Sequence, residues 1–173
     1  MEQPTITKIT DRKEAVLLIE PLCKEIRDKP APFEDEDALL LITLWLLEKT
    51  EAECHIVRVG DQVAAFLLLR RMNDAPPPGQ NDPWEAIYLY VGRKWRKKHY
   101  GSRLLLECGR DELNGNVADA NEPSVHMLQS LGWALQPAPL TKPILSAFVM
   151  IRGYCPELSS FPRMLTGRYA KKK

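Results

Sequence analysis

The chain has 173 residues, and its 24 Lys and Arg residues nearly balance its 23 Asp and Glu residues, leaving a net charge of +1. This length suits one domain with a substantial core, and the charge balance excludes proteins that bind nucleic acid through a uniformly basic surface. The four cysteines lie far apart without a CxxC pair and the three histidines are scattered, so we expect reduced thiols and no metal site.

The first residues and the apolar runs favour a soluble, cytoplasmic protein. Residues 1–5 lack the basic and apolar regions of a signal peptide. The most apolar run, Ala38 to Leu47, is about half as long as a helix that spans a bilayer. We therefore expect no membrane association.

The first third of the chain predicts a strand and two helices. Residues 5–10 alternate weakly, as a strand does, and Asp11 is placed to cap a helix that runs to about Asp28. Acidic residues at 34–37 open a second helix, which runs to about Lys49. The second helix is apolar around most of its circumference, which favours burial in the core, with a partner surface as the alternative.

The middle of the chain predicts a hairpin, an exposed loop and another strand. Residues 53–59 and 62–72 are rich in strand-forming residues and flank a Gly-Asp pair, which is a compact turn signal. Residues 73–83 are rich in Pro, Gly and Asn, which predicts an exposed loop. An apolar strand at 85–91 follows.

The remaining chain alternates helices and strands before a less regular end. The expected elements are a helix at about 101–113 ended by Asn114 and Gly115, a short strand at 116–120, a helix at 122–131 and a strand at 145–151. The whole order predicts a mixed α/β sheet with helices on both faces. We assign residues 1–152 to a single domain and residues 153–173 to a C-terminal tail that is either flexible or ordered only on contact with a partner.

The most informative segment links the strand at 85–91 to the helix that follows it. Its cations are Arg93, Lys94, Arg96, Lys97 and Lys98. A helix N-terminus exposes unpaired N–H groups and about half a positive charge, which favours phosphate. The segment therefore predicts an anion site, with a solvated basic loop as the alternative.

This segment resembles the acyl-CoA-binding motif of the GNAT family of N-acetyltransferases. The core of that motif reads Q/R-x-x-G-x-G/A, and Arg96 to Gly101 stands in its place. A second family signature, N-x-x-A-x-x-x-Y-x-x-x-G-F, is matched by Asn121 to Trp133 without a gap. The resemblance covers roughly residues 5–152 and implies a mixed, mostly antiparallel central sheet with helices on both faces.

The resemblance also implies a co-substrate, acetyl-CoA, and residues that hold it. The pyrophosphate of CoA would lie on Arg96, Lys97, Lys98, His99, Tyr100, Gly101 and Ser102. The N–H of Leu89 would polarise the thioester carbonyl, and Tyr90 and Val91 would line the pantetheine arm. Asn121 would contact the pantetheine amides. The alternatives are ordinary core and turn roles for these residues.

The catalytic residues match the family less closely. Glu85 stands eleven positions before Arg96, which is the spacing of the general-base glutamate in the histone-acetyltransferase branch. A simple exposed carboxylate at a strand start is the alternative. His99 replaces the first glycine of the core motif, and Leu128 replaces the tyrosine that protonates the departing thiolate.

Three hypotheses follow for the function. The first is an acetyl-CoA-dependent N-acetyltransferase that acts on a small amine or a lysine by direct attack on the thioester. The second is a GNAT-fold binding or structural protein without catalysis, resembling degenerate bacteriophage proteins, with the helix at 38–47 or the tail mediating self-association or docking to a protein. The third, nucleic-acid binding through residues 93–98 and 171–173, is the weakest, because CoA itself requires basic residues beside its phosphates.

Overall fold

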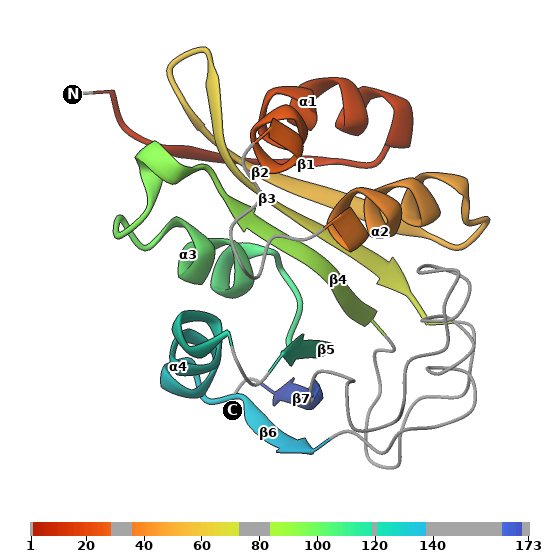
Figure 1. Cartoon of the computed structure of the whole chain (residues 1–173), viewed down its shortest axis with the longest axis vertical. Coiled ribbons are helices and arrows are strands. Elements are labelled where there is room, and N and C mark those ends of the chain that lie inside the picture. The colour runs from red at the N-terminus through yellow and green to blue at the C-terminus, as the bar shows by residue number, and fades with distance from the viewer. Residues whose placement is uncertain (1, 29–35, 73–83, 119–120, 138–163, 171–173) are drawn as a thin grey trace.

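A seven-stranded sheet in the order β1-β2-β3-β4-β5-β7-β6 organises the molecule (Figure 1). The structure, a computed structural model, describes residues 2–28, 36–72, 84–118, 121–137 and 164–170. Its strands are β1 (Thr5–Ile9), β2 (Ala52–Val59), β3 (Gln62–Arg71), β4 (Trp84–Val91), β5 (Glu112–Ala118), β6 (Ala134–Pro137) and β7 (Met164–Ala170). Its helices are α1 (Arg12–Asp28), α2 (Glu36–Leu47), the 3-10 turn η1 (Arg93–Trp95), α3 (Tyr100–Glu107) and α4 (Glu122–Ser130). Neighbouring strands are antiparallel except β4 and β5, which are parallel.

Helices cover both faces of this sheet, α1 and α2 on one face and α3 and α4 on the other (Figure 1). Residues of β3 alternate between the two faces, as the period of a strand requires. Phe66 and Leu68 pack with α1 and α2, whereas Leu67 and Leu69 pack with α3. The prediction of a mixed, mostly antiparallel sheet with helices on both faces is therefore confirmed.

The predictions for the N-terminal half are confirmed by β1, α1 and the β2–β3 hairpin. The N–H of Glu14 donates to Oδ1 of Asp11 at 2.9 Å, so Asp11 caps α1. Gly60 turns the hairpin with φ +58°, a conformation that glycine adopts without steric cost.

Among residues 41–47, whose burial the structure describes, helix α2 is buried along one side. Ile42 is 5% exposed and Trp45 is 1% exposed, and Nε1 of Trp45 donates to the carbonyl of Leu69 at 2.9 Å. Leu44 and Leu47 are 42% and 71% exposed. The core role that the sequence favoured is thus confirmed for one face of the helix. None of the described helices has the length and apolar character needed to span a membrane.

The prediction of a helix from 101 to 113 is wrong in its second half. Helix α3 ends at Glu107, and Gly109 follows with φ +75°. Gly115 lies inside β5 and does not end a helix. A Cβ on Gly115 would come within 3.3 Å of Cζ3 of Trp133, so glycine there permits close packing of an indole ring on the strand.

The prediction of a separate tail is also wrong for part of the chain. Met164 to Ala170 form β7, which pairs with β5 on one side and β6 on the other. The sheet therefore extends beyond the boundary that the sequence suggested at residue 152. The predicted strand at 145–151 lies outside the described residues.

Candidate functional site

Strands β4 and β5 pair only where β4 begins. Their register contains Glu85 opposite Asn114 and Ala86 opposite Gly115. On its other side β4 carries a bulge at Ile87, because Leu69 of β3 pairs with Ala86 and Leu68 with Tyr88. A bulge bends a strand and increases its twist. From Ile87 onward, no described strand pairs with this edge of β4.

The backbone at Leu89 faces this open edge. Gly92 donates its N–H to the carbonyl of Ala64 in β3 at 2.9 Å. Because N–H groups alternate in direction along a strand, the N–H groups of Leu89 and Val91 point away from β3. Nε of Arg96 donates to the carbonyl of Val91 at 3.2 Å, which agrees with that direction.

The turn between β4 and α3 contains two residues in the left-handed region. Lys97 and His99 both have φ +61°, and His99 is the N-cap of α3. Left-handed backbone costs about 1 kcal/mol or more for a residue with a Cβ. The first bond of α3 runs from the N–H of Arg103 to the carbonyl of His99 at 3.0 Å. The N–H groups of residues 100–102 consequently have no acceptor within the helix.

Basic side chains of this turn gather around two aromatic rings. Nζ of Lys94 lies 4.9 Å and Nζ of Lys98 lies 4.8 Å from the centroid of Trp95. The guanidinium of Arg96 lies 5.7 Å from the centroid of Tyr90. The side chains of Lys94, Arg96, Lys97 and Lys98 are exposed. The turn thus combines free N–H groups with cations, as an anion site requires.

Other predicted site residues have structural contacts of their own. A Cβ on Gly101 would lie 3.3 Å from Sδ of Met127 and 3.5 Å from Cγ2 of Val91, so this glycine brings α3 close to β4 and α4. Tyr100 is 8% exposed and packs on Trp95 at 6.4 Å between ring centroids. Ser102, in the first turn of α3, is half-buried.

Three further predicted positions can be placed in the same way. The Tyr90 side chain packs in the core on the α1 and α2 side, whereas Val91 packs toward α3. Because their side chains lie on opposite faces of the sheet, Tyr90 and Val91 could contact one ligand together only through their backbone atoms at the open edge of β4. Asn121 caps α4, with Oδ1 accepting from the N–H of Ser124 at 3.4 Å. Leu128 packs in the apolar cluster under α3.

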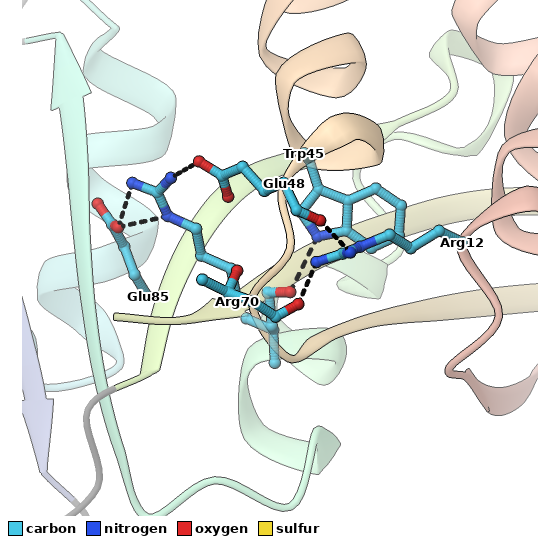
Figure 2. Close-up of polar contacts among 7 residues, drawn as sticks. Arg12, Trp45, Glu48, Arg70 and Glu85 are labelled. Carbon is cyan, nitrogen blue, oxygen red and sulfur yellow. Dashed lines mark hydrogen bonds and ion pairs between the residues drawn. The ribbon is translucent and has the colours of Figure 1, made fainter. Parts of the chain in front are cut away.

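Glu85 is paired with an arginine (Figure 2). Nε and Nη2 of Arg70 both donate to Oε2 of Glu85 at 3.0 Å, and Nη1 of Arg70 donates to Glu48 at the end of α2. On the far side of Glu48, Arg12 donates to the backbone carbonyls of Glu48 and Thr50. Arg70, which joins the two carboxylates, is not among the site residues predicted from the sequence.

Glu25 of α1 was also missed. Its Oε1 accepts from the hydroxyl of Tyr90 at 2.9 Å and from the backbone N–H of Arg93 at 2.7 Å. Burial and the neighbouring Glu25 carboxylate raise the pKa of Tyr90, so this phenol stays protonated at neutral pH. No local sequence signal connects residues so far apart in the chain.

A second polar cluster lies on the α3 side of the sheet, around Glu53. This carboxylate accepts from Lys8 and from Arg110, each at 2.5 Å, and lies 3.1 Å from Nε2 of His55. Burial alone would raise the pKa of Glu53, but hydrogen bonds from Lys8 and His55 and the charge of Arg110 lower it. Burial lowers the pKa of His55. Arg110, which follows α3, also stacks on Trp84 at 3.7 Å from the ring centroid.

Comparisons with known proteins connect this geometry to a family. Residues 19–133 match the model of the acetyltransferase (GNAT) family. The structure is similar to a GNAT-family acetyltransferase from Streptococcus pneumoniae, with a TM-score of 0.57 and 14% identity over 97% of this chain and 99% of that chain. It is also similar to the ribosomal-protein-S18-alanine N-acetyltransferase from Escherichia coli, with a TM-score of 0.59 and 14% identity over 99% and 96% of the two chains.

A Bacillus subtilis acetyltransferase solved in complex with CoA is similar as well, with a TM-score of 0.57 and 14% identity over 99% of this chain and 100% of that chain. At such identities these structures establish the fold alone. No curated protein matches the chain in sequence. The family match spans well over half of the chain and includes α3, α4 and the open edge of β4, so the chain belongs to the GNAT family of acetyltransferases.

Proposed function

We propose that this protein transfers an acetyl group from acetyl-CoA to an amine by direct attack of the amine on the thioester. The observation that carries the proposal is the open edge of β4 beside a basic turn. This edge presents the N–H of Leu89, and the turn at residues 96–102 presents N–H groups and cations at the start of α3. One extended ligand with phosphates at one end and a carbonyl at the other fits that arrangement.

Each part of acetyl-CoA would meet a different group of the chain. The pyrophosphate would accept hydrogen bonds from the turn and neutralise its cations. The pantetheine would run along the backbone edge of Tyr90 and Val91, with Asn121 nearby. The thioester oxygen would accept from the N–H of Leu89, which would stabilise the negative charge that develops there during attack.

The acceptor would approach from the face that carries Glu85. An ammonium must lose its proton before it can attack, and a carboxylate within hydrogen-bond reach can take that proton. Arg70 binds only Oε2 of Glu85, which leaves Oε1 to serve as the base. The same Oε1 can accept a hydrogen bond from an ammonium, so the proposed acceptor is a cation, either a small amine or a lysine side chain.

A second candidate function is a binding protein that retains the fold without catalysis. Two observations favour it: Glu85 is engaged by Arg70, and the apolar Leu128 stands where the family often has an acid. This protein would bind CoA, or a protein partner, and release no thiol. Measuring free thiol from acetyl-CoA with a panel of primary amines separates the two candidates.

Isothermal titration with acetyl-CoA and with CoA tests the proposal directly. We expect saturable binding, and we expect His99→Gly to leave the Kd unchanged or to lower it, since glycine removes a Cβ from a left-handed residue. Absence of saturable heat at millimolar ligand would contradict the proposal. A large loss of affinity in His99→Gly would mean instead that the imidazole itself contacts the phosphates.

Glu85→Gln is expected to lower turnover at neutral pH by about 10²-fold, because general bases contribute at least that much. The affinity for CoA should not change, and turnover should recover partly at high pH, where the amine loses its proton unaided. Glu51→Gln is the matched control, because Glu51 also pairs with an arginine, Arg71, at 3.3 Å on the exposed surface. The same pH–rate profile in wild type and Glu85→Gln would remove Glu85 from the mechanism.

A further inference from the structure

The carboxylate of Glu25 joins helix α1 to the start of the phosphate-binding turn. A single oxygen, Oε1, accepts from the backbone N–H of Arg93 at 2.7 Å and from the hydroxyl of Tyr90 at 2.9 Å. Arg93 is the first residue of η1, and the first N–H groups of any helical turn have no acceptor within it. Glu25 supplies that missing acceptor from an element 68 positions away in sequence.

A second contact holds α1 against the same point of the turn. A Cβ on Gly92 would lie 2.8 Å from Cδ2 of Leu22, which precedes Glu25 by about one turn of α1. It would also lie 3.2 Å from Cδ1 of Trp95 and 3.3 Å from the carbonyl of Ala64. The chain at Gly92 is therefore enclosed by α1, β3 and its own turn, and Glu25 binds the N–H of the next residue, Arg93.

The contacts of Glu25 continue to the cations of the turn. Tyr90, which donates to Glu25, has the Arg96 guanidinium 5.7 Å from its ring centroid. Arg96 in turn donates to the carbonyl of Val91. A change in the position of Glu25 would thus reach Arg93 directly and Arg96 through the ring of Tyr90.

The negative charge of Glu25 does not account for its position beside a turn that is proposed to bind phosphate. A negative charge beside an anion-binding turn opposes phosphate, whereas a hydrogen-bond acceptor at Arg93 N–H fixes the backbone that carries the cations. We propose that Glu25 is a positioning residue for the phosphate-binding turn and that its hydrogen bonds, rather than its charge, set the affinity for CoA. This inference rests on the proposed function for its ligand.

Four variants of the full chain separate position from charge. Glu25→Ala removes the acceptor, Glu25→Gln keeps an oxygen at Oε1 without the charge, and Tyr90→Phe removes one of the two donors. Glu20→Ala is the matched control, a glutamate on the exposed side of the same helix. The measurements are the Kd for CoA by isothermal titration, the hydrogen-exchange rate of the Arg93 amide by NMR without ligand, and the melting temperature.

We expect Glu25→Ala to weaken CoA binding by about tenfold, as the loss of two hydrogen bonds predicts. Exchange of the Arg93 amide should accelerate in the same variant. Glu25→Gln should restore both the affinity for CoA and the slow exchange of the Arg93 amide. Tyr90→Phe should weaken CoA binding less than Glu25→Ala does, and the Arg93 amide should remain protected from exchange. Glu20→Ala should match wild type in both measurements.

Two results would overturn the inference. Unchanged CoA binding in Glu25→Ala would show that the turn holds its shape alone, and tighter binding in both Glu25 variants would show that the carboxylate acts only as a repulsive charge. If Glu25→Ala does not fold, the comparison of Glu25→Gln with wild type decides between position and charge. If wild type binds no CoA, the proposed function fails, and the exchange rate of Arg93 decides separately whether Glu25 holds the turn.

Discussion

Replacing Leu89 with proline is expected to lower turnover by about 10²- to 10³-fold, the cost of removing one donor from an oxyanion hole. Proline has no N–H, and the N–H of Leu89 points toward the open edge of β4 rather than toward β3. The substitution therefore removes no bond of the β3–β4 ladder. The affinity for CoA should remain close to that of wild type, because the phosphates bind elsewhere.

Leu89→Ala controls for the loss of the side chain, because it keeps the N–H. Tyr90→Pro provides the opposite control: its N–H faces β3, so proline there should unfold the sheet, as circular dichroism would show. Steady-state turnover and CoA titration complete the comparison. Equal loss of activity in Leu89→Ala and Leu89→Pro would assign the effect to packing against α3 and remove the N–H from the mechanism.

Replacing Glu53 with alanine is expected to lower the free energy of unfolding by about 3–5 kcal/mol, the usual effect of removing one partner from a buried ion pair. The Glu53 side chain is 7% exposed, and its loss would leave Arg110, 19% exposed, without this carboxylate. Urea denaturation measures the change. The exposed pair of Arg103 and Glu107 in α3 is the control, and Glu107→Ala should change the free energy by less than about 1 kcal/mol.

The same cluster predicts the response to acid. Burial lowers the pKa of His55 below 6.5, so the unfolded chain takes up a proton near that pH while the folded chain does not. Stability is then lost as the pH falls below about 6.5. The lowered pKa of Glu53 acts in the same direction at lower pH, below its ordinary value of 4.5. His55→Gln should flatten the stability curve between pH 7 and pH 5, and an unchanged slope would contradict this origin.

Much of the fold could be predicted because its signals are local. The cap at Asp11, the hairpin glycine at position 60 and the alternation along β3 each depend on neighbouring residues, and each is found in the structure. Gly115 misled the prediction for the opposite reason. Its function is to accommodate Trp133, eighteen positions away, and a distant ring leaves no trace in the local pattern.

The residues of the candidate site also divide into those with a local sequence signal and those without one. The turn at residues 96–101 could be located because a glycine, a run of cations and a helix start lie within a few positions of one another. Glu25 and Arg70 could not, because each acts on residues far along the chain that only the folded sheet brings near. The positive φ of His99 was foreseeable from the glycine that the family places there.

The place of β7 in the sheet has a consequence for how the chain folds. Strands β5 and β6 are both synthesised before β7, yet neither pairs with the other, and β7 lies between them. Until the ribosome has released residues 164–170, β5 and β6 both lack β7, the strand with which they pair antiparallel in the folded protein. Such late, long-range pairing slows folding and exposes strand edges to other chains. The first five strands can pair before β7 is available, so we expect the insertion of β7 between β5 and β6 to be a late step of folding.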